Sequence, residues 1–180
     1  DIEDSTKITS KLSDAQTSRL YGKFLNFTAG IIQSHQGVVV KNVGDAILFY
    51  FDCPNPHKKS EFTRVLGCCM DLIEQKDELD ARLKDSGLPS INFRISSTYG
   101  SVMIAKILKF GTPDIFGSTV NQTFKINRLS KTNGLVISDR LYEKVKTTNG
   151  YKFKESTEHF PTEFGYSVYH VSKIAKFYQH

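Results

Sequence analysis

The sequence predicts an α+β protein in which helices pack on a sheet that contains antiparallel strands. Segments with apolar residues at helical spacing alternate along the chain with segments of strand character, and turn residues bring the strands together in pairs. The order helix, hairpin, helix, hairpin, helix, strands is typical of ferredoxin-like or palm-type folds. Because 180 residues with 39% hydrophobic content can build one core, we expect a single domain over residues 1–180.

The elements of the first half follow from apolar spacing and turn residues. Apolar side chains recur at helical spacing after Ser13, a good N-cap, and the pattern stops at Gly37. Two apolar runs then flank the pair Gly44–Asp45, which suits a hairpin turn. The expected elements are a helix from Ser13 to Gln36, strands Val38–Val43 and Ala46–Phe51, a loop with Pro54 and Pro56, and a helix from Phe62 to Leu83.

Strand patterns are more frequent in the second half. Residues 91–99, INFRISSTY, alternate in polarity, and another apolar run follows Gly100, so we expect a second hairpin there. The expected elements are strands Ile91–Tyr99 and Val102–Phe110, a helix from Ser118 to Ser130, strand Leu135–Ile137, a short helix Asp139–Val145, and strands near Tyr151–Lys154 and Tyr166–Val171. Since this kind of fold supports many functions, the function must be argued from a site.

Composition narrows the class of protein. A net charge of +5 suits nucleic acid, an anionic membrane surface or a phosphorylated small molecule, but the lysines are scattered. No basic cluster with interleaved aromatic residues appears, so we expect no nucleic-acid partner. No apolar run is long enough to cross a membrane. The three cysteines, two of them adjacent at Cys68–Cys69, show no metal or disulfide spacing and suggest a cytoplasmic protein with reduced thiols.

One turn carries more charge than a turn needs. The stretch KNVGDAILFYF places Lys41 and Asp45 around the tight turn of the first hairpin. The pair Gly44–Asp45 is explained by the turn itself, because it supplies a positive φ and a local side-chain hydrogen bond. Lys41 is not explained in this way. Taken alone, it is best interpreted as a solvated lysine near the end of a strand.

Three separated stretches give Lys41 another interpretation. DIEDST at residues 1–6, KNVGD at residues 41–45 and DIFGSTVN at residues 114–121 resemble, in order and spacing, the catalytic domain of class III nucleotidyl cyclases, the family of adenylate and guanylate cyclases. The resemblance extends over Arg94–Ile107 and Asn121–Ser138 and weakens after about Val145. It implies a class III cyclase-like fold and a reaction in which the 3′-hydroxyl of a nucleoside triphosphate attacks its own α-phosphorus and expels pyrophosphate.

The resemblance implies a two-metal site. The family's ligands correspond to the carboxylates of Asp1 and Asp45 and the backbone carbonyl of Ile2, and two Mg²⁺ or Mn²⁺ ions suit these hard oxygen donors. The loop that leads to Ser5 and Thr6 matches the family's phosphate-binding loop, whose backbone amides hold the phosphates. Taken singly, Asp45 is a turn residue and Asp1 a chain end.

The resemblance also implies which nucleobase the site recognises. In adenylate cyclases a lysine at the position of Lys41 and an acceptor at that of Asp114 match adenine N1 and N6, whereas guanylate cyclases carry an acidic residue in place of the lysine. We therefore expect ATP as the substrate. An alternative is that Asp114 caps the helix that begins after Gly117.

Two further residues are implied, and one departs from the family. Asn121 corresponds to the asparagine that orients the ribose. The family's transition-state arginine falls at Lys125, and Arg128 lies one turn further along. The phosphate-binding lysine of the family's last hairpin has no aligned counterpart here, although Lys152 and Lys154 lie upstream. Because family members combine metal ligands from one protomer with base-binding groups from the other, a homodimer is implied.

Two functions remain open on the sequence alone. One is an adenylate cyclase of low intrinsic activity, regulated by a sensor domain upstream. The other is a non-catalytic cyclase-homology domain that binds nucleotide or dimerises. Asp1 can hold a metal well only when a strand fixes it. We therefore also expect the natural chain to extend upstream of Asp1, as a short apolar strand whose last residue is Ile2.

Overall fold

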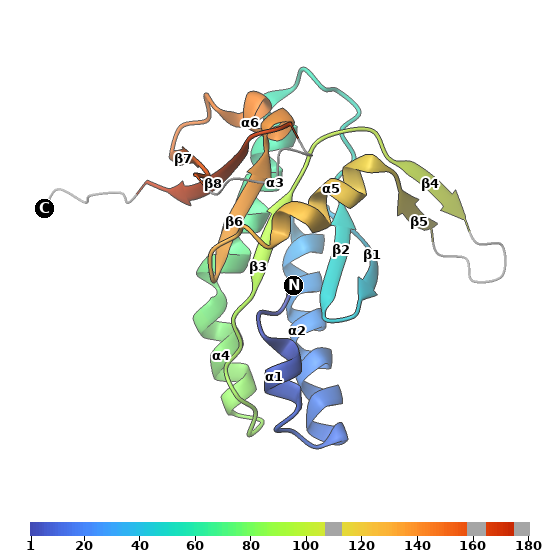
Figure 1. The fold of residues 1–180 in the computed structure, drawn as a ribbon, viewed down its shortest axis with the longest axis vertical. Helices are drawn as coiled ribbons and strands as arrows, with labels where there is room; N and C mark the ends of the chain where they lie inside the picture. The colour runs from blue at the N-terminus through green and yellow to red at the C-terminus, as the bar shows by residue number, and fades with distance from the viewer. Residues whose placement is uncertain (107–112, 158–164, 175–180) are drawn as a thin grey trace, which may run out of the picture.

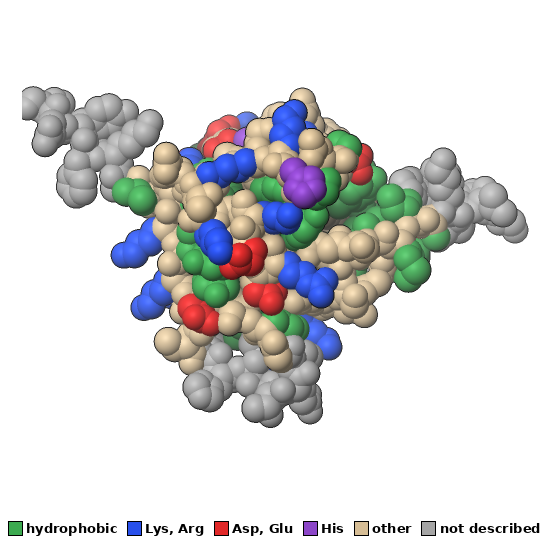
Figure 2. All heavy atoms as spheres, turned by 90° about the horizontal axis from the view of Figure 1, so that it is seen from above, with side chains coloured by type: hydrophobic (Ala, Val, Ile, Leu, Met, Phe, Trp, Pro, Cys, Tyr) green, Lys and Arg blue, Asp and Glu red, His purple; other side chains and the backbone are tan. Residues whose placement is uncertain are grey.

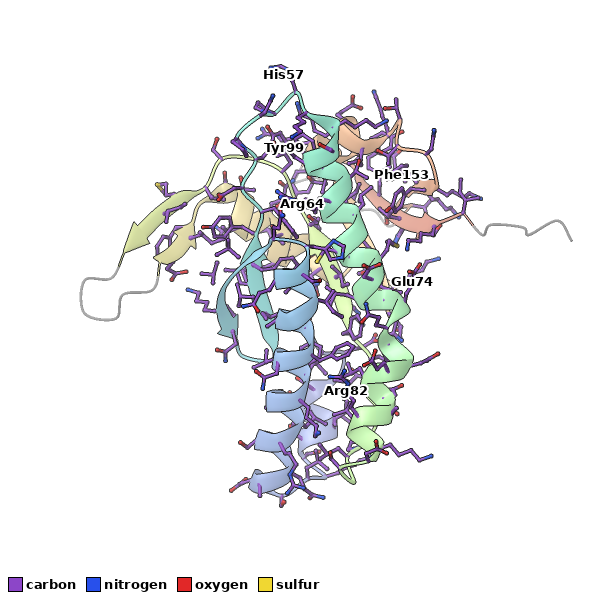
Figure 3. The ribbon with its side chains drawn as sticks, turned by 180° about the vertical axis from the view of Figure 1, so that it is seen from behind. His57, Arg64, Glu74, Arg82, Tyr99 and Phe153 are labelled. Carbon is purple, nitrogen blue, oxygen red and sulfur yellow. The ribbon has the colours of Figure 1, made fainter. Side chains whose placement is uncertain are left out.

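The computed structural model describes residues 1–106, 113–157 and 165–174 (Figure 1). It has the mixed α+β architecture that the sequence predicts. No helix in these ranges is long and apolar enough to span a membrane. Two small antiparallel ladders lie on the β3 side of a mixed sheet of four strands (Figure 1). Long helices cover one side of the sheet and the first hairpin, as Figure 3 shows from behind.

The longest helix begins and ends near its predicted bounds. α2, Asp14–Ser34, starts with a capping box in which the Ser13 side chain accepts from the Gln16 amide and the Gln16 side chain accepts from the Ser13 amide. Its buried face includes Leu20, Phe24 and Ile32, which belong to the main core. Gly37, which follows the helix, packs closely on the Ile32 side chain, since a Cβ at this position would lie 2.6 Å from it.

The first hairpin is confirmed. β1, Val38–Val43, pairs antiparallel with β2, Ala46–Tyr50, across the turn Gly44–Asp45. Gly44 has φ 62, which glycine adopts without strain. The register shifts between Val39 and Lys41, as at a β-bulge, and a bulge redirects the side chains that follow it.

The mixed sheet has the order β3-β6-β8-β7. β3, Arg94–Ser97, runs parallel to β6, Gly134–Ser138, whereas β8, Val168–Lys173, is antiparallel to both β6 and β7, Tyr151–Glu155. The helix α6, Asp139–Val145, follows β6 directly, and the Ser138 side chain accepts from the Leu141 amide at its start. β6, α6, β7 and β8 lie near their predicted ranges, but the order of the strands in the sheet was not predicted.

The second predicted hairpin is wrong. The run 91–99 contains β3, whose partner is β6, and the strand after Gly100 is β4, Met103–Lys106, whose partner is β5, Pro113–Phe116. Gly100 packs closely on helix α5, Ser118–Asn127, since a Cβ on Gly100 would meet the Thr119 hydroxyl at 2.5 Å. β4 and β5 instead extend outward as an arm (Figure 1), and residues 107–110 of the predicted strand lie outside the described residues.

The helices also differ from the prediction in three ways. The predicted helix 62–83 is two helices, α3, Lys59–Glu74, and α4, Lys76–Lys84, which meet at a bend at Gln75. Backbone hydrogen bonding continues through the bend, since the Gln75 amide donates to the Asp71 carbonyl at 3.0 Å. α5 ends at Asn127 and not at Ser130. The short helix α1, Ser5–Thr9, was not predicted, because its five residues are too few to show a period.

The main core lies between the long helices and the mixed sheet. It joins side chains of α2, α3 and α4 to those of β3, β6 and α6, and includes both Cys68 and Cys69. Burial raises the pKa of the Cys68 thiol to about 12. These cysteines are therefore neutral core side chains, as expected from the lack of any metal-binding spacing.

Candidate active site

Asp1 and Asp45 line one cavity of about 520 Å³. Residue 1 and the turn of the first hairpin are distant in sequence, so the fold brings these carboxylates to a common space. Ser5 and Thr6, which were predicted from the resemblance, line the same cavity. The full lining comprises Asp1, Ile2, Glu3, Asp4, Ser5, Thr6, Lys7, Ser10, Asp45 and Arg94.

A short antiparallel ladder holds Asp1 in place. The Arg94 amide donates to the Asp1 carbonyl at 2.8 Å, the Asp1 nitrogen donates to the Arg94 carbonyl at 3.2 Å, and the Glu3 amide donates to the Asn92 carbonyl at 2.8 Å. Ile2 faces Phe93 between these bonds, as a non-hydrogen-bonded pair does. The carbonyl of Ile2 is therefore directed away from residues 92–94 and is available to another ligand.

The donor set at this cavity fits a hard divalent cation. Two carboxylates and a backbone carbonyl suit Mg²⁺ or Mn²⁺, which commonly complete their coordination with water and substrate phosphates. Within residues 1–106, 113–157 and 165–174, no group of three or more His, Cys, Asp and Glu side chains is arranged to hold a metal. An ion at this cavity would thus depend on Asp1, Asp45, the Ile2 carbonyl and a bound nucleotide.

The loop beside the carboxylates has a geometry suited to anions. Asp4 adopts a left-handed conformation with φ 55, and the chain then enters α1 without a side-chain cap at its start. The first amides of a helix have no acceptor within the helix. The amides of Ser5 and Thr6 can therefore donate to phosphate oxygens, as the sequence resemblance implied.

Glu3 and Arg94 form an ion pair at the edge of the cavity. The Glu3 carboxylate bonds the Arg94 guanidinium and also accepts from the Thr132 hydroxyl at 2.7 Å. The hydrogen bond from Thr132 and the Arg94 guanidinium lower the pKa of Glu3. Its negative charge is thus compensated before a phosphate enters. Sequence reasoning did not identify this role of Arg94, because a single arginine in an alternating strand gives no signal of its partner.

The structure brings Lys41 and Asp114 together. Lys41 on β1 forms an ion pair with Asp114 on β5, while the other Asp114 oxygen accepts from the Ile115 amide at 2.8 Å. The hydrogen bond from Lys41 is the main cause of the lowered pKa of Asp114. The alternative interpretation of Asp114 as a helix cap is wrong, because α5 is capped by Gly117 and no side chain bonds its first amides.

Asn121 and Lys125 lie on the exposed face of α5. The opposite face binds the strand beneath it. The Ser96 hydroxyl donates to the Thr123 carbonyl at 2.9 Å, and the side-chain amide of Asn127 donates to the Arg94 carbonyl at 3.3 Å. Neither Asn121 nor Lys125 lines the cavity of the two aspartates. The predicted residues of one chain therefore form separate groups.

A larger cleft of about 760 Å³ separates β2 from β3. It is lined by β2, by residues 93–102 and by α5, with side chains of α2 and α3 behind them, and it reaches Asp1. β2 and β3 are both edge strands of their own ladders. Because strand hydrogen bonds alternate, Ser96 directs its backbone groups to the same edge of β3 as Arg94, toward this cleft.

Comparisons with known proteins agree with the sequence resemblance. A model of the adenylate and guanylate cyclase catalytic domain matches residues 1–165. The adenylyl cyclase CyaB from P. aeruginosa has a similar structure, with a TM-score of 0.80 and 19% identity over 98% of this chain and 92% of that chain. No curated protein sequence gave a significant match.

Guanylyl cyclases are similar as well. The guanylyl cyclase domain of the RhoGC fusion protein from the aquatic fungus Blastocladiella emersonii has a TM-score of 0.79 and 23% identity over 96% of this chain and 92% of that chain. The guanylate cyclase domain of RhGC from Catenaria anguillulae, solved in complex with GTP, has a TM-score of 0.74 and 20% identity over 96% of this chain and 92% of that chain. At these identities the likeness shows the fold and does not select a nucleobase.

The ion pair of Glu3 predicts a specific pH dependence of stability. A carboxyl whose pKa is lowered on folding stabilises the protein above its unfolded pKa, here about 4.5, and this stabilisation is lost as the pH falls through the lowered value. We expect Glu3→Gln to lower the free energy of unfolding near neutral pH and to make little difference once the pH has fallen below the lowered pKa of Glu3. Denaturant titrations across this range measure the difference.

Thr132→Val gives an independent check, because it removes the main cause of the lowered pKa and keeps the Glu3 carboxylate. Thr132→Val should lower the free energy of unfolding by less than Glu3→Gln does, with the same dependence on pH. A difference between Glu3→Gln and the unaltered protein that stays constant from acid to neutral pH would contradict this account.

Proposed function

This chain belongs to the family of adenylate and guanylate cyclase catalytic domains, and we propose that it is an adenylate cyclase, converting ATP to 3′,5′-cyclic AMP and pyrophosphate. The observation that carries the proposal is the ion pair of Lys41 and Asp114 on a chain whose Asp1 and Asp45 line a common cavity. The first pair suits adenine, and the second pair suits the metal ions that this chemistry requires.

The residues of the cavity would bind and orient the triphosphate. Asp1, Asp45 and the Ile2 carbonyl would hold two Mg²⁺ or Mn²⁺ ions, which activate a ribose hydroxyl and neutralise phosphate charge when they are bound. The amides of Ser5 and Thr6 would donate to phosphate oxygens. Arg94 keeps Glu3 neutralised, so that the acidic start of the loop does not repel the phosphates.

Lys41 and Asp114 would read the edge of the base. A lysine ammonium has three donors and one of them serves Asp114, so another can donate to adenine N1. The Asp114 carboxylate has further lone pairs that can accept from the exocyclic amino group of adenine. Guanine presents a donor at N1 and an acceptor at O6, and this pair would repel it at both positions.

The separation of the two groups supports a homodimer. The cavity of Asp1 and Asp45 contains neither Asn121 nor Lys125. A second copy of the chain would supply these side chains, with Asn121 orienting the ribose and Lys125 stabilising charge on the α-phosphate. Each dimer would then contain two equivalent sites.

A non-catalytic domain is the second candidate, and Lys125 favours it. A lysine in place of the family's arginine keeps the charge and loses the planar fork that can bond two phosphate oxygens. Nucleic-acid binding is disfavoured, since Lys and Arg side chains on the face shown in Figure 2 are interspersed with Asp and Glu and form no continuous basic stripe.

Product formation decides between the two candidates. The purified chain is incubated with Mg²⁺ or Mn²⁺ and with ATP, GTP, CTP or UTP, and the cyclic nucleotide is quantified by chromatography. We expect cyclic AMP from ATP at a rate well above that for the other nucleotides. The absence of any cyclic nucleotide with either metal would support the non-catalytic alternative.

Removal of one metal-binding carboxylate should abolish turnover. Asp45→Asn keeps the size of the side chain and removes one of the two carboxylate charges that would hold two dications. We expect no detectable cyclic AMP, with the melting temperature and the sedimentation coefficient unchanged. Activity equal to that of the unaltered chain would remove the two-metal interpretation.

Reversal of the charge at residue 41 should change the preference for the base. Lys41→Glu replaces a donor by an acceptor and places it beside Asp114, so adenine N1 loses its partner. We expect the ratio of kcat/KM for ATP to that for GTP to fall, with full conversion requiring a neutral residue at position 114 as well. If this ratio does not change, Lys41 does not select the base and is only a solvated lysine near the end of a strand.

The lysine at position 125 should limit the rate. A charge-assisted hydrogen bond contributes roughly 1.5 to 3 kcal/mol, so a bond made only in the transition state corresponds to about tenfold to a hundredfold in rate. We expect Lys125→Arg to raise kcat by about tenfold or more while the apparent affinity for ATP changes little. Steady-state kinetics at several ATP concentrations separate the two effects.

Arg128→Ala is the control for the register of α5, since Arg128 is the C-cap of that helix, one turn from Lys125. Loss of activity in Arg128→Ala together with full activity in Lys125→Ala would mean that Arg128 has the transition-state role.

A further inference from the structure

An exposed aromatic ring lies next to the pair of Lys41 and Asp114. Phe116 ends β5 and is 42% exposed. Ile115 between Asp114 and Phe116 is buried. Since side chains alternate along a strand, Asp114 and Phe116 share the outward face of β5.

Lys41 connects the ring to the ion pair. Its ammonium nitrogen lies over the face of Phe116, 5.8 Å from the ring centroid, while it bonds Asp114. Three side chains of different chemistry, a donor, an acceptor and an aromatic face, therefore converge at one corner between β1 and β5. The fold of β5 does not require an aromatic residue at position 116, because a polar side chain could occupy this exposed strand end equally well.

A purine needs recognition on its face as well as on its edge. Hydrogen bonds to Lys41 and Asp114 would satisfy the edge, but the planar faces of a base favour stacking on an aromatic ring. Because the Lys41 nitrogen lies 5.8 Å from the Phe116 centroid, an acceptor that bonds this nitrogen at about 2.9 Å can also come into contact with the ring. We propose that Phe116 is a base-binding residue, whose ring forms one wall of the purine site beside Lys41 and Asp114; this rests on the proposed function.

Two competing roles for Phe116 make different predictions. If the ring only positioned the Lys41 ammonium, its loss would affect the choice between adenine and guanine and not the binding of purines in general. If it only contacted a second copy of the chain, its loss would weaken the dimer. A stacking wall instead contributes to the binding of either purine, because every base has an aromatic face.

Nucleotides that bind without reacting provide the test. Dissociation constants of 3′-deoxy-ATP and 3′-deoxy-GTP, which lack the attacking hydroxyl, are measured by calorimetry in the presence of Mn²⁺. The variants are Phe116→Ala and Phe116→Tyr. Phe124→Ala is the matched control, because Phe124 is 41% exposed but lies on α5. Sedimentation of each protein measures the dimer.

We expect Phe116→Ala to weaken the binding of both analogues by about tenfold. Phe116→Tyr should retain binding, Phe124→Ala should leave it unchanged, and the dimer should persist in all of them. The proposal is overturned if both affinities are unchanged in Phe116→Ala, if only the ratio between the analogues changes, or if the loss of affinity follows dissociation of the dimer. These measurements need no turnover. If the chain binds the analogues but forms no cyclic AMP, the proposed cyclase activity is disproved, and the dissociation constants still test the role of Phe116 in binding.

Discussion

The strand β3 is the element on which the candidate site depends. One of its edges pairs with β6, and the other edge, extended through residues 92–94, holds residues 1–3 by backbone hydrogen bonds. The side chains of Ser96 in this strand and of Thr98 just after it bond α5. The position of Asp1 and the placement of α5 thus both depend on this short strand.

The anchoring of α5 also explains why one chain does not assemble the whole site. A helix presents residues three or four apart on the same face. Thr119, Thr123 and Asn127 occupy the face that binds β3, which leaves Asn121 and Lys125 on the outside. The face that fixes the helix and the face that would act on the nucleotide cannot be the same. Hydrogen-bonded anchoring within the chain therefore leaves the second face available to the second copy of the chain that we propose.

The sequence predicted those parts of the molecule that local chemistry determines. The long helix α2 and the first hairpin follow from apolar spacing, a capping box and a Gly–Asp turn. The pairing of strands across the sheet was predicted less well, because Arg94–Ser97 looks the same whether its partner is the next strand or one forty residues later. Family resemblance placed Asp1 and Asp45 in one site, but not the ion pair of Glu3 with Arg94 or the ring of Phe116. These depend on contacts between distant segments, which no local pattern encodes.

The cleft between β2 and β3 is a place where the fold can accept a further strand. Two strand edges face each other across it, and the backbone groups of Ser96 point toward it. Edges of this kind can add a strand from another molecule. A strand that entered this cleft could pair with both edges at once and would join the first hairpin to the mixed sheet.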